Sequence, residues 1–151
     1  MIENKAELIA IARRKAQEYG LPADLVCAVI EQESGWDTTA MRFEPDFFMK
    51  YVRPSYLAGR MKATEAYARA YSWGLMQIMG ETAREEGFTG EFLTALCDPE
   101  TGIDAGCKHL AIIFKKVPIG PSAQTIALER YNGGSNPNYA PETIARMISY
   151  A

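Results

Sequence analysis

Apolar side chains recur along this chain at helical spacing, over stretches that glycine and proline separate. The first stretch follows Asn4, which stands at capping-box spacing from Glu7, and it ends at Gly20. The second begins at Pro22 and reaches about Ser34, because the glycine that follows is a poor helix residue. The pattern therefore predicts two helices near the start of the chain.

The strongest helix signal lies in the second half of the chain. The pair Asp98-Pro99 supplies an N-cap acid and a proline at the first helical position. An apolar stripe then continues to Phe114, which predicts a long, central, buried helix. Shorter helices are predicted over residues 81–86, over residues 122–130 and from Pro141 towards the end.

Residues 41–56 have a different composition, rich in aromatic side chains and prolines without a regular period. We expect an extended or looped insertion here, with room for a short strand, and then a short alanine-rich helix within residues 58–71. No repeat, low-complexity tract or interdomain linker interrupts the sequence. The whole pattern predicts one compact domain over residues 1–151, mainly α with little strand.

Glu33 is an ionisable residue in the middle of an apolar helical face. Each residue of a helix advances about 100°, which places Glu33 near the centre of that face and Glu31 on the opposite, solvated side. The apolar residues of the face are Leu25, Val26, Val29 and Ile30. Burial disfavours the charged carboxylate and raises its pKa, as a general acid at neutral pH requires. The alternative is a helix-terminal glutamate that turns outward at Gly35 and pairs with an arginine.

The overall composition narrows the possible functions. The chain has 151 residues, of which 48% are hydrophobic and 23% charged, so it can bury a core without disulfide or metal support. Its net charge is −3 and it contains no run of Lys and Arg, which argues against nucleic-acid binding. This charge also gives no electrostatic attraction to anionic cell walls.

The cysteines and the N-terminus argue against a metal site, a disulfide framework, a signal peptide and a membrane span. Cys27, Cys97 and Cys107 are odd in number and lack the spacing of a zinc site, so we predict no metal site and no disulfide framework. Cys27 is expected to be buried, and Cys97 and Cys107 could pair only in an oxidising compartment. Residues 1–7 carry acids where a signal peptide needs basic residues, and no apolar run approaches the roughly 20 residues that span a bilayer.

Three segments occur in an informative order: Glu33-Ser34-Gly35-Trp36, then Gly74-Leu75-Met76-Gln77-Ile78-Met79, then Tyr131-Asn132-Gly133-Gly134. They resemble the E-S, G-L-M-Q and A-Y-N-G-G motifs of the soluble lytic transglycosylase family, which is part of the lysozyme-like superfamily. The resemblance extends from about Leu21 to the C-terminus. Each segment alone is a weak signal, but all three in order on a helical chain of this length are specific.

The resemblance implies a peptidoglycan lytic transglycosylase with a lysozyme-like fold. Such an enzyme cleaves the β-1,4 bond between N-acetylmuramic acid and N-acetylglucosamine and releases 1,6-anhydromuramyl products. Glu33 would act as the sole acid and base, with no cofactor. The implied partner is the peptidoglycan glycan strand, acted on in the periplasm or outside the cell by a monomer that does not insert into membranes. Without a signal peptide, the chain is expected to be phage-encoded or a domain trimmed from a larger protein.

Two further residues of the first two motifs receive roles from the resemblance. Ser34 would orient the sugar acetamido group or Glu33, and its alternative role is a contact at the end of the helix. Met76 would lie near the sugar, although a methionine at helical spacing is more often a core residue.

The remaining motif residues are also implied to bind substrate. Gln77 is an uncharged donor and acceptor suited to a sugar amide or hydroxyl. Tyr131 would place its hydroxyl near Glu33, unless it is an ordinary aromatic core residue. Asn132 belongs to a turn that allows close substrate approach.

Two departures from the family pattern leave alternatives open. The distance from Ser34 to Gly74 exceeds that of the compact family version, so residues 41–72 would form an added lobe or a wall of the substrate cleft. Arg130 stands where the family usually has alanine. The insertion contains Glu44, a possible second carboxylate that would permit an inverting hydrolase, a muramidase resembling goose-type lysozyme, if it lay roughly 6.5–9.5 Å from Glu33.

The sequence gives less support to functions outside the glycan-cleaving enzymes. A non-catalytic glycan-binding or phage structural module could keep the same fold, although a pure binder has no need for a buried acid. The one histidine, His109, lies in the long helix without a HExxH pattern or a neighbouring nucleophile, which argues against a metal-dependent hydrolase or a cysteine protease.

Overall fold

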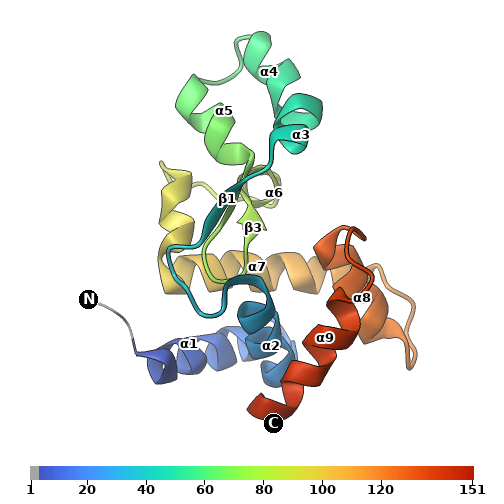
Figure 1. Ribbon diagram of the computed structural model, residues 1–151. Helices are drawn as coiled ribbons and strands as arrows, with labels where there is room; N and C mark the ends of the chain where they lie inside the picture. Colours follow the sequence, from blue (N-terminus) through green and yellow to red (C-terminus); the bar gives the residue numbers. More distant parts are fainter. Residues whose placement is uncertain (1–3) are drawn as a thin grey trace.

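The computed structural model describes residues 4–151; residues 1–3, part of the acidic start considered above, lie outside the described residues. Two long helices, α1 and α7, extend along the lower body of the molecule, and α2, α8 and α9 complete it (Figure 1). The bounds of these helices are α1 Lys5–Glu18, α2 Ala23–Ser34, α7 Pro99–Lys115, α8 Ala123–Asn132 and α9 Tyr139–Arg146. The expected mainly α architecture is confirmed.

Local capping groups explain why the helix starts could be predicted. The Asn4 Oδ1 atom accepts a hydrogen bond from the Ala6 amide at 3.0 Å, which confirms the predicted start of α1. The Asp98 carboxylate accepts from the Thr101 amide at 3.0 Å and starts α7 as expected. Gly35 ends α2 in the left-handed conformation, with φ of 59°.

Helix α2 is the centre of the core. Every side chain from Leu25 to Ile30 is fully buried, including Cys27, because α1, α9 and the 3₁₀ turn η3 (Met147–Tyr150) pack around it. Helix α7 faces this core through a stripe of Ile103, Cys107 and Leu110. Packing from several sides therefore buries more of α2 than the single apolar face that its sequence predicts.

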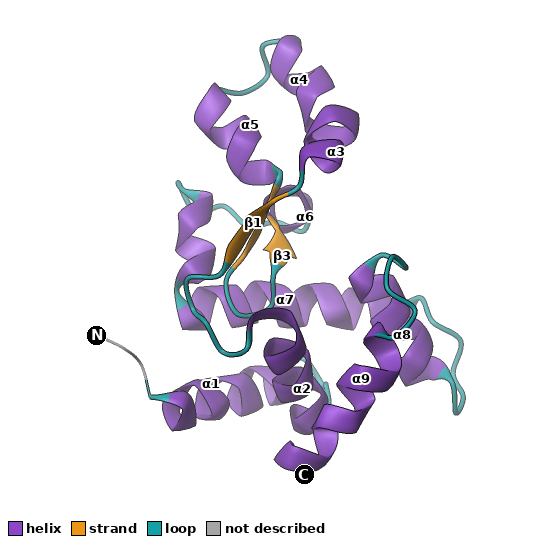
Figure 2. Cartoon of the chain, in the orientation of Figure 1, coloured by secondary structure: helices purple, strands orange, loops and turns teal. Residues whose placement is uncertain are grey.

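A small antiparallel sheet lies between the lower body and the upper end of the molecule (Figure 2). Its strands β1 (Met41–Phe43), β2 (Tyr71–Trp73) and β3 (Ile78–Met79) are arranged in that order. Arg42 pairs with Ser72, and Ser72 pairs with Met79. The short strand expected near residue 41 is confirmed, but β2 and β3 were not predicted because two or three residues are too few to show an alternating pattern.

The looped insertion expected after β1 is wrong. This segment is helical, comprising α3 (Pro45–Phe47), the π-helical turn η1 (Phe48–Val52) and α4 (Arg53–Leu57). The alanine-rich helix that follows is confirmed as α5 (Ala63–Arg69), and together they form the upper lobe in Figure 1. A π-helical turn breaks the 3.6-residue period, so the apolar pattern could not reveal this helix.

The lobe has a small core of its own. Phe48 and Val52 pack with Ala66 and Ala70 on the facing segment. The rings of Phe48 and Tyr67 stack with their centroids 4.7 Å apart. The aromatic residues that made this segment look irregular in sequence are therefore the residues that hold it together.

The other short elements connect the sheet to α7 and close the chain. Helix α6 (Gly80–Glu85) follows β3 directly, and the 3₁₀ helix η2 (Leu93–Cys97) precedes α7. Helix α9 begins at Tyr139, two residues before the predicted start at Pro141. Within the described chain, the helices are all too short or too polar to cross a membrane.

The turn that joins β2 to β3 packs directly against α7. A Cβ atom added to Gly106 of α7 would lie 2.5 Å from the Met76 sulfur and 2.6 Å from its Cβ. These distances are far below van der Waals contact, so the absence of a side chain at position 106 allows α7 to approach the turn. Met76 itself is fully buried in this contact.

We expect the substitution Gly106→Ala to destabilise the fold by about 1–3 kcal/mol, because the added methyl group must displace the buried Met76 side chain. Alanine has the higher helix propensity by about 1 kcal/mol, so propensity alone predicts the opposite sign. Urea unfolding measures the difference. The matched control is Lys115→Ala at an exposed position of the same helix, which should leave stability within about 0.5 kcal/mol; a stabilised Gly106→Ala protein would contradict the close packing.

Candidate active site

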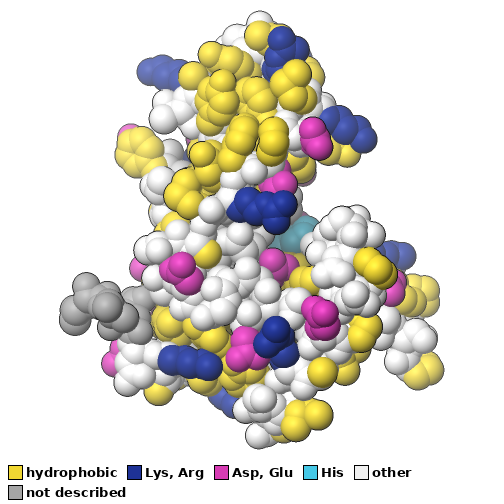
Figure 3. Space-filling model, viewed as in Figure 1, with side chains coloured by type: hydrophobic (Ala, Val, Ile, Leu, Met, Phe, Trp, Pro, Cys, Tyr) yellow, Lys and Arg dark blue, Asp and Glu magenta, His cyan; other side chains and the backbone are white. Residues whose placement is uncertain are grey.

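A cleft of about 520 Å³ runs between the lobe and the helical body, a size typical of small-molecule sites. Figure 3 shows the surface hollowed between these two parts, beneath the apolar side chains that gather over the lobe. Residues from the lobe side, the sheet and the helices α2, α7 and α8 line it. They are Glu33, Arg42, Glu44, Phe47, Ser72, Gln77, Ile78, Met79, Thr82, His109, Tyr131, Asn132, Gly133 and Ser135.

Glu33 lies in the last turn of α2 and projects into this cleft. Burial raises the pKa of its carboxyl to about 7, although a hydrogen bond from Tyr139 opposes the shift. Glu33 takes part in none of the ion pairs among residues 4–151, so the alternative of an outward, arginine-paired glutamate does not describe it. Glu31, by contrast, is paired with Arg146 on the other side of α2.

Tyr139 is a site residue that the sequence did not reveal. Its hydroxyl donates a hydrogen bond to Glu33 Oε1 at 2.6 Å, and the side chain is only 4% exposed. Burial and the nearby Glu33 carboxylate raise the pKa of Tyr139 far above its ordinary value, so it remains a donor. The two residues are far apart in sequence and meet only because α9 packs on α2.

Tyr131 is close to Glu33 but makes a different hydrogen bond. Its hydroxyl donates to the carbonyl oxygen of Met76 at 2.6 Å. The pKa of Tyr131 is raised by burial first and by the charge of Glu33 second. Tyr131 therefore lines the cleft with Glu33, and its hydroxyl proton is used by the backbone of the β2–β3 turn.

Gln77 occupies the cleft surface in a strained conformation with φ of 49°. Its amide nitrogen donates to the carbonyl oxygens of Ala40 and Gly74 at 3.0 and 2.9 Å, and its Oε1 accepts from the Ser72 hydroxyl at 3.0 Å. Both amide hydrogens are thus used within the protein. Gln77 holds the strands of the small sheet together at the cleft, and one lone pair on Oε1 is left for other contacts.

Ser34 and Met76 do not line the cleft. The Ser34 hydroxyl lies 3.0 Å from the Ile30 carbonyl oxygen and 2.8 Å from that of Leu75, so it links the end of α2 to the β2–β3 turn. Met76 is fully buried behind the turn. These two motif residues support the site from behind and are not at its surface.

Asn132 does line the cleft, and its side-chain nitrogen is buried without a hydrogen-bond partner within residues 4–151. A buried amide donor without a partner is uncommon in a folded protein and is explained if a ligand completes it. The sequence placed Asn132 in a turn; the structure makes it the last residue of α8, with Gly133 as the left-handed cap.

Glu44 is a second carboxylate in the same cleft. Glu44 lies directly after β1, and its Oε1 atom is 3.0 Å from Nε of Arg42. Arg42 also lines the cleft. Glu44 is therefore both in the cleft and in an ion pair. The cleft carries two carboxylates in different surroundings: Glu33 is buried and bonded to a phenol, whereas Glu44 is paired with a guanidinium.

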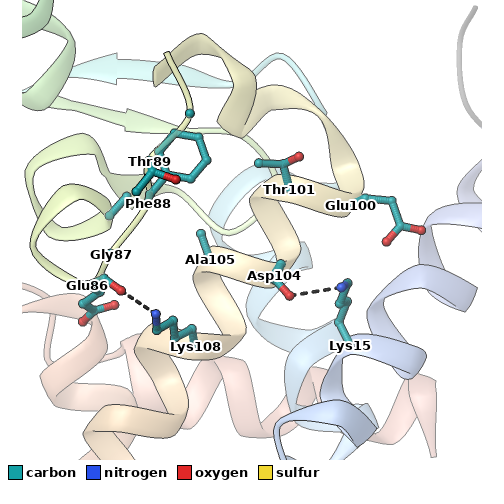
Figure 4. A pocket seen from close by; sticks show the side chains of 12 residues that line it. Lys15, Glu86, Gly87, Phe88, Thr89, Glu100, Thr101, Asp104, Ala105 and Lys108 are labelled. Atoms are coloured by element: carbon teal, nitrogen blue, oxygen red, sulfur yellow. Dashed lines mark hydrogen bonds and ion pairs between the residues drawn. The ribbon is translucent and has the colours of Figure 1, made fainter. Parts of the chain in front are cut away.

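A second cavity of about 470 Å³ lies against α7 and α1, and Glu33 does not line it (Figure 4). Its charged side chains already have partners in the protein. Lys15 pairs with Asp104 at 3.0 Å, and the Lys108 ammonium donates to the backbone carbonyl of Glu86.

No cluster of three or more His, Cys, Asp or Glu that could hold a metal ion occurs in the described part of the chain. The three cysteines are free thiols, with Cys27 and Cys107 buried as small core residues. Burial raises the pKa of Cys107 to about 12, which keeps this thiol protonated.

A comparison with models of known protein families shows to which family the chain belongs. The model of the transglycosylase SLT domain matches residues 10–144, which is most of the chain. The chain belongs to the SLT transglycosylase family. The resemblance carried by the three motifs is thereby confirmed, together with the mainly α, lysozyme-like fold class that it implied.

The SLT match is accompanied by one distant relative. The membrane-bound lytic murein transglycosylase C of Edwardsiella ictaluri (strain 93-146) is 27% identical over 135 residues. The alignment covers 83% of this chain and 30% of that protein, so the SLT chain spans under a third of the relative's length. No solved structure matches the chain.

Because the folded-state pKa of Glu33 is raised from 4.5 to about 7, ionising this carboxyl opposes folding. The contribution of Glu33 to stability is greatest below pH 4.5, and it is lost as the pH rises to about 7. We expect Glu33→Gln to stabilise the protein by about 3 kcal/mol at about pH 8 and to have little effect at about pH 4.

Urea unfolding at the two pH values measures this difference. Glu91→Gln, which removes an exposed carboxyl on the α6–η2 connection, is the control and should show no gain at the higher pH. Equal stability of the Glu33→Gln and wild-type proteins at about pH 8 would contradict a desolvated Glu33.

The hydrogen bond from Tyr139 favours the charged form of Glu33, so its removal should raise the pKa further. We expect Tyr139→Phe to shift the Glu33 pKa upward by about one unit. Carboxyl carbon NMR titration of the variant measures it directly. A fall in the Glu33 pKa on Tyr139→Phe would contradict the assignment. Tyr131→Phe is the comparison variant, and it should destabilise the fold by about 1–2 kcal/mol because the buried Met76 carbonyl loses its donor.

Proposed function

We propose that the protein is a peptidoglycan lytic transglycosylase that cleaves the β-1,4 bond between N-acetylmuramic acid and N-acetylglucosamine and forms 1,6-anhydromuramyl products. The observation that supports this most is the state of Glu33: a carboxyl in a cleft whose pKa burial raises to about 7. A group with this pKa is protonated in a large fraction of molecules at neutral pH and can also act as a base after it has given its proton.

The same carboxyl can serve both halves of this reaction. Glu33 gives its proton to the glycosidic oxygen as the bond from the muramic C1 breaks, and the N-acetylglucosamine end leaves as an alcohol. The carboxylate then takes the proton of the C6 hydroxyl as that oxygen bonds to C1, which restores the acid. Because Oε1 accepts from Tyr139, Oε2 is the oxygen left to carry the proton.

The other motif residues divide into contacts and supports. Gln77 and Asn132 line the cleft and are proposed to bind the sugar, the Asn132 amide through the donor that has no partner in the protein. Ser34, Met76 and Tyr131 are proposed to keep the β2–β3 turn against α2 and α8. The hydrogen bonds of Ser34 and Tyr131 to the backbone carbonyls of Leu75 and Met76 support this division.

The lobe is proposed to be one wall of the substrate cleft. Arg42, Glu44 and Phe47, all from residues 41–72, line the cleft opposite the helical body. We expect the protein to act as a monomer on the glycan strands of the wall. The expected place of action is the periplasm or the cell exterior.

A second candidate is a hydrolytic muramidase, favoured by the presence of Glu44 in the same cleft as Glu33. In that reaction a carboxylate activates a water that attacks C1, and the product has a reducing muramyl end. A glycan-binding module without activity is the third candidate.

Mass spectrometry of the sugars released from purified peptidoglycan tests these candidates. Wild-type protein should release anhydromuramyl products, which are lighter by one water than hydrolytic products. Glu33→Gln should lower turnover by about a hundredfold to ten-thousandfold, because general acid catalysis contributes on the order of 10²–10⁴. Glu44→Gln should retain most of the turnover.

The alternatives give different results in the same assay. Reducing muramyl ends together with loss of turnover in Glu44→Gln would favour the muramidase. No release by wild-type protein from several wall types, with equal binding of wall fragments by wild type and Glu33→Gln, would favour the binding module.

A further inference from the structure

The one histidine of the chain lies at the active-site cleft, although no role was assigned to it from the sequence. His109 projects from α7, with its side chain 24% exposed. Its ring packs against the ring of Tyr131 with the centroids 5.5 Å apart. The imidazole therefore lies against α8 and lines the same cleft as Asn132, the residue after Tyr131.

A carboxylate holds the far side of this ring. Glu86, at the end of α6, places Oε1 2.6 Å from His109 Nδ1. A carboxylate oxygen only accepts hydrogen bonds, so Nδ1 carries the proton. In the neutral ring this leaves Nε2 without a hydrogen, as an acceptor.

Glu86 is dedicated to this contact. Its side chain is only 16% exposed, and its Oε2 is buried without a hydrogen-bond partner in residues 4–151. The backbone carbonyl of the same residue accepts from Lys108, which ties the end of α6 to α7 (Figure 4). A buried carboxylate with a single polar contact is costly for packing alone, and orienting an imidazole accounts for it.

The cleft contains a donor and an acceptor that make no hydrogen bond within residues 4–151. The amide hydrogens of Gln77 and the hydroxyl of Tyr131 are bonded within the protein. The Asn132 nitrogen is a donor without a partner, and His109 Nε2 has no partner among the described residues. One free donor and one free acceptor in one cleft match an acetamido group, which presents a carbonyl oxygen and an N–H.

We propose that His109, oriented by Glu86, contacts the substrate, and that its Nε2 accepts a hydrogen bond from an N–H or hydroxyl of an N-acetylated sugar. The inference rests on the proposed function, because it takes the glycan as the occupant of the cleft. His109 binds in this scheme and Glu33 performs the chemistry. Glu86 acts through His109 and is a positioning residue.

Nitrogen-15 NMR tests the orientation directly, because a single histidine gives one set of imidazole signals that need no assignment. The free protein should show the tautomer protonated at Nδ1. Glu86→Leu, which removes the acceptor but keeps the volume, should lose this preference, and Glu86→Gln should retain it through the amide oxygen. A ring protonated at Nε2 in the wild-type protein would overturn the proposal.

Binding and kinetics test the contact with the sugar. Addition of tetra-N-acetylchitotetraose should shift the Nε2 resonance of the wild-type protein. On peptidoglycan, His109→Phe, which keeps a ring but no acceptor, should raise KM by about three- to tenfold with little change in kcat, as expected for one lost hydrogen bond. His109→Gln can supply an acceptor in place of Nε2 and should recover most of the loss.

The outcomes separate this inference from the proposed function. If wild-type protein releases anhydromuramyl sugars and His109→Phe has an unchanged KM, the sugar contact is wrong and the proposed function stands. An equal loss in His109→Gln and His109→Phe, with the NMR signal unmoved by the oligosaccharide, reduces His109 to a packing role and overturns the proposal. If wild-type protein neither binds the oligosaccharide nor cleaves peptidoglycan, the proposed function and the contact fall together.

Discussion

The burial of one carboxyl group is the constraint on which the rest of the site depends. Glu33 is placed among apolar residues at the end of α2, where ionisation is unfavourable, and it receives one hydrogen bond, from Tyr139. These opposing effects leave its pKa near 7. The fold accepts this unfavourable group because α2 is held on several sides by α1, α9 and η3.

The three motifs are connected mainly to one another. Ser34 and Tyr131 both reach backbone carbonyls of the β2–β3 turn, and Gln77 ties that turn to the residue before β1. Gly106 lets α7 pack beneath the same turn. Residues that a motif comparison treats as substrate ligands therefore fix the backbone that surrounds Glu33. Asn132 and His109 are lining residues of the cleft that do not take part in these supporting contacts.

The lobe and the strand that leads into it supply one side of the cleft that contains Glu33. The lobe has a small aromatic core of its own, and this side of the cleft is lined by Arg42, Glu44 and Phe47. Two carboxylates then share one cleft in contrasting surroundings, the first desolvated and the second paired with a guanidinium. This contrast favours the proposed acid role for Glu33.

The sequence by itself determined the long helices and the position of Glu33 on the inner face of α2. Caps such as Asn4 and Asp98 act within one turn, and the 3.6-residue apolar pattern places Glu33 on the inner face of α2, so local chemistry was sufficient. Tertiary structure alone decided the rest: the π-helical segment of the lobe, the Tyr139 hydrogen bond and the Glu86–His109 pair. These features join segments distant in the chain or break the helical period, and contacts formed only by packing leave no local pattern in the sequence.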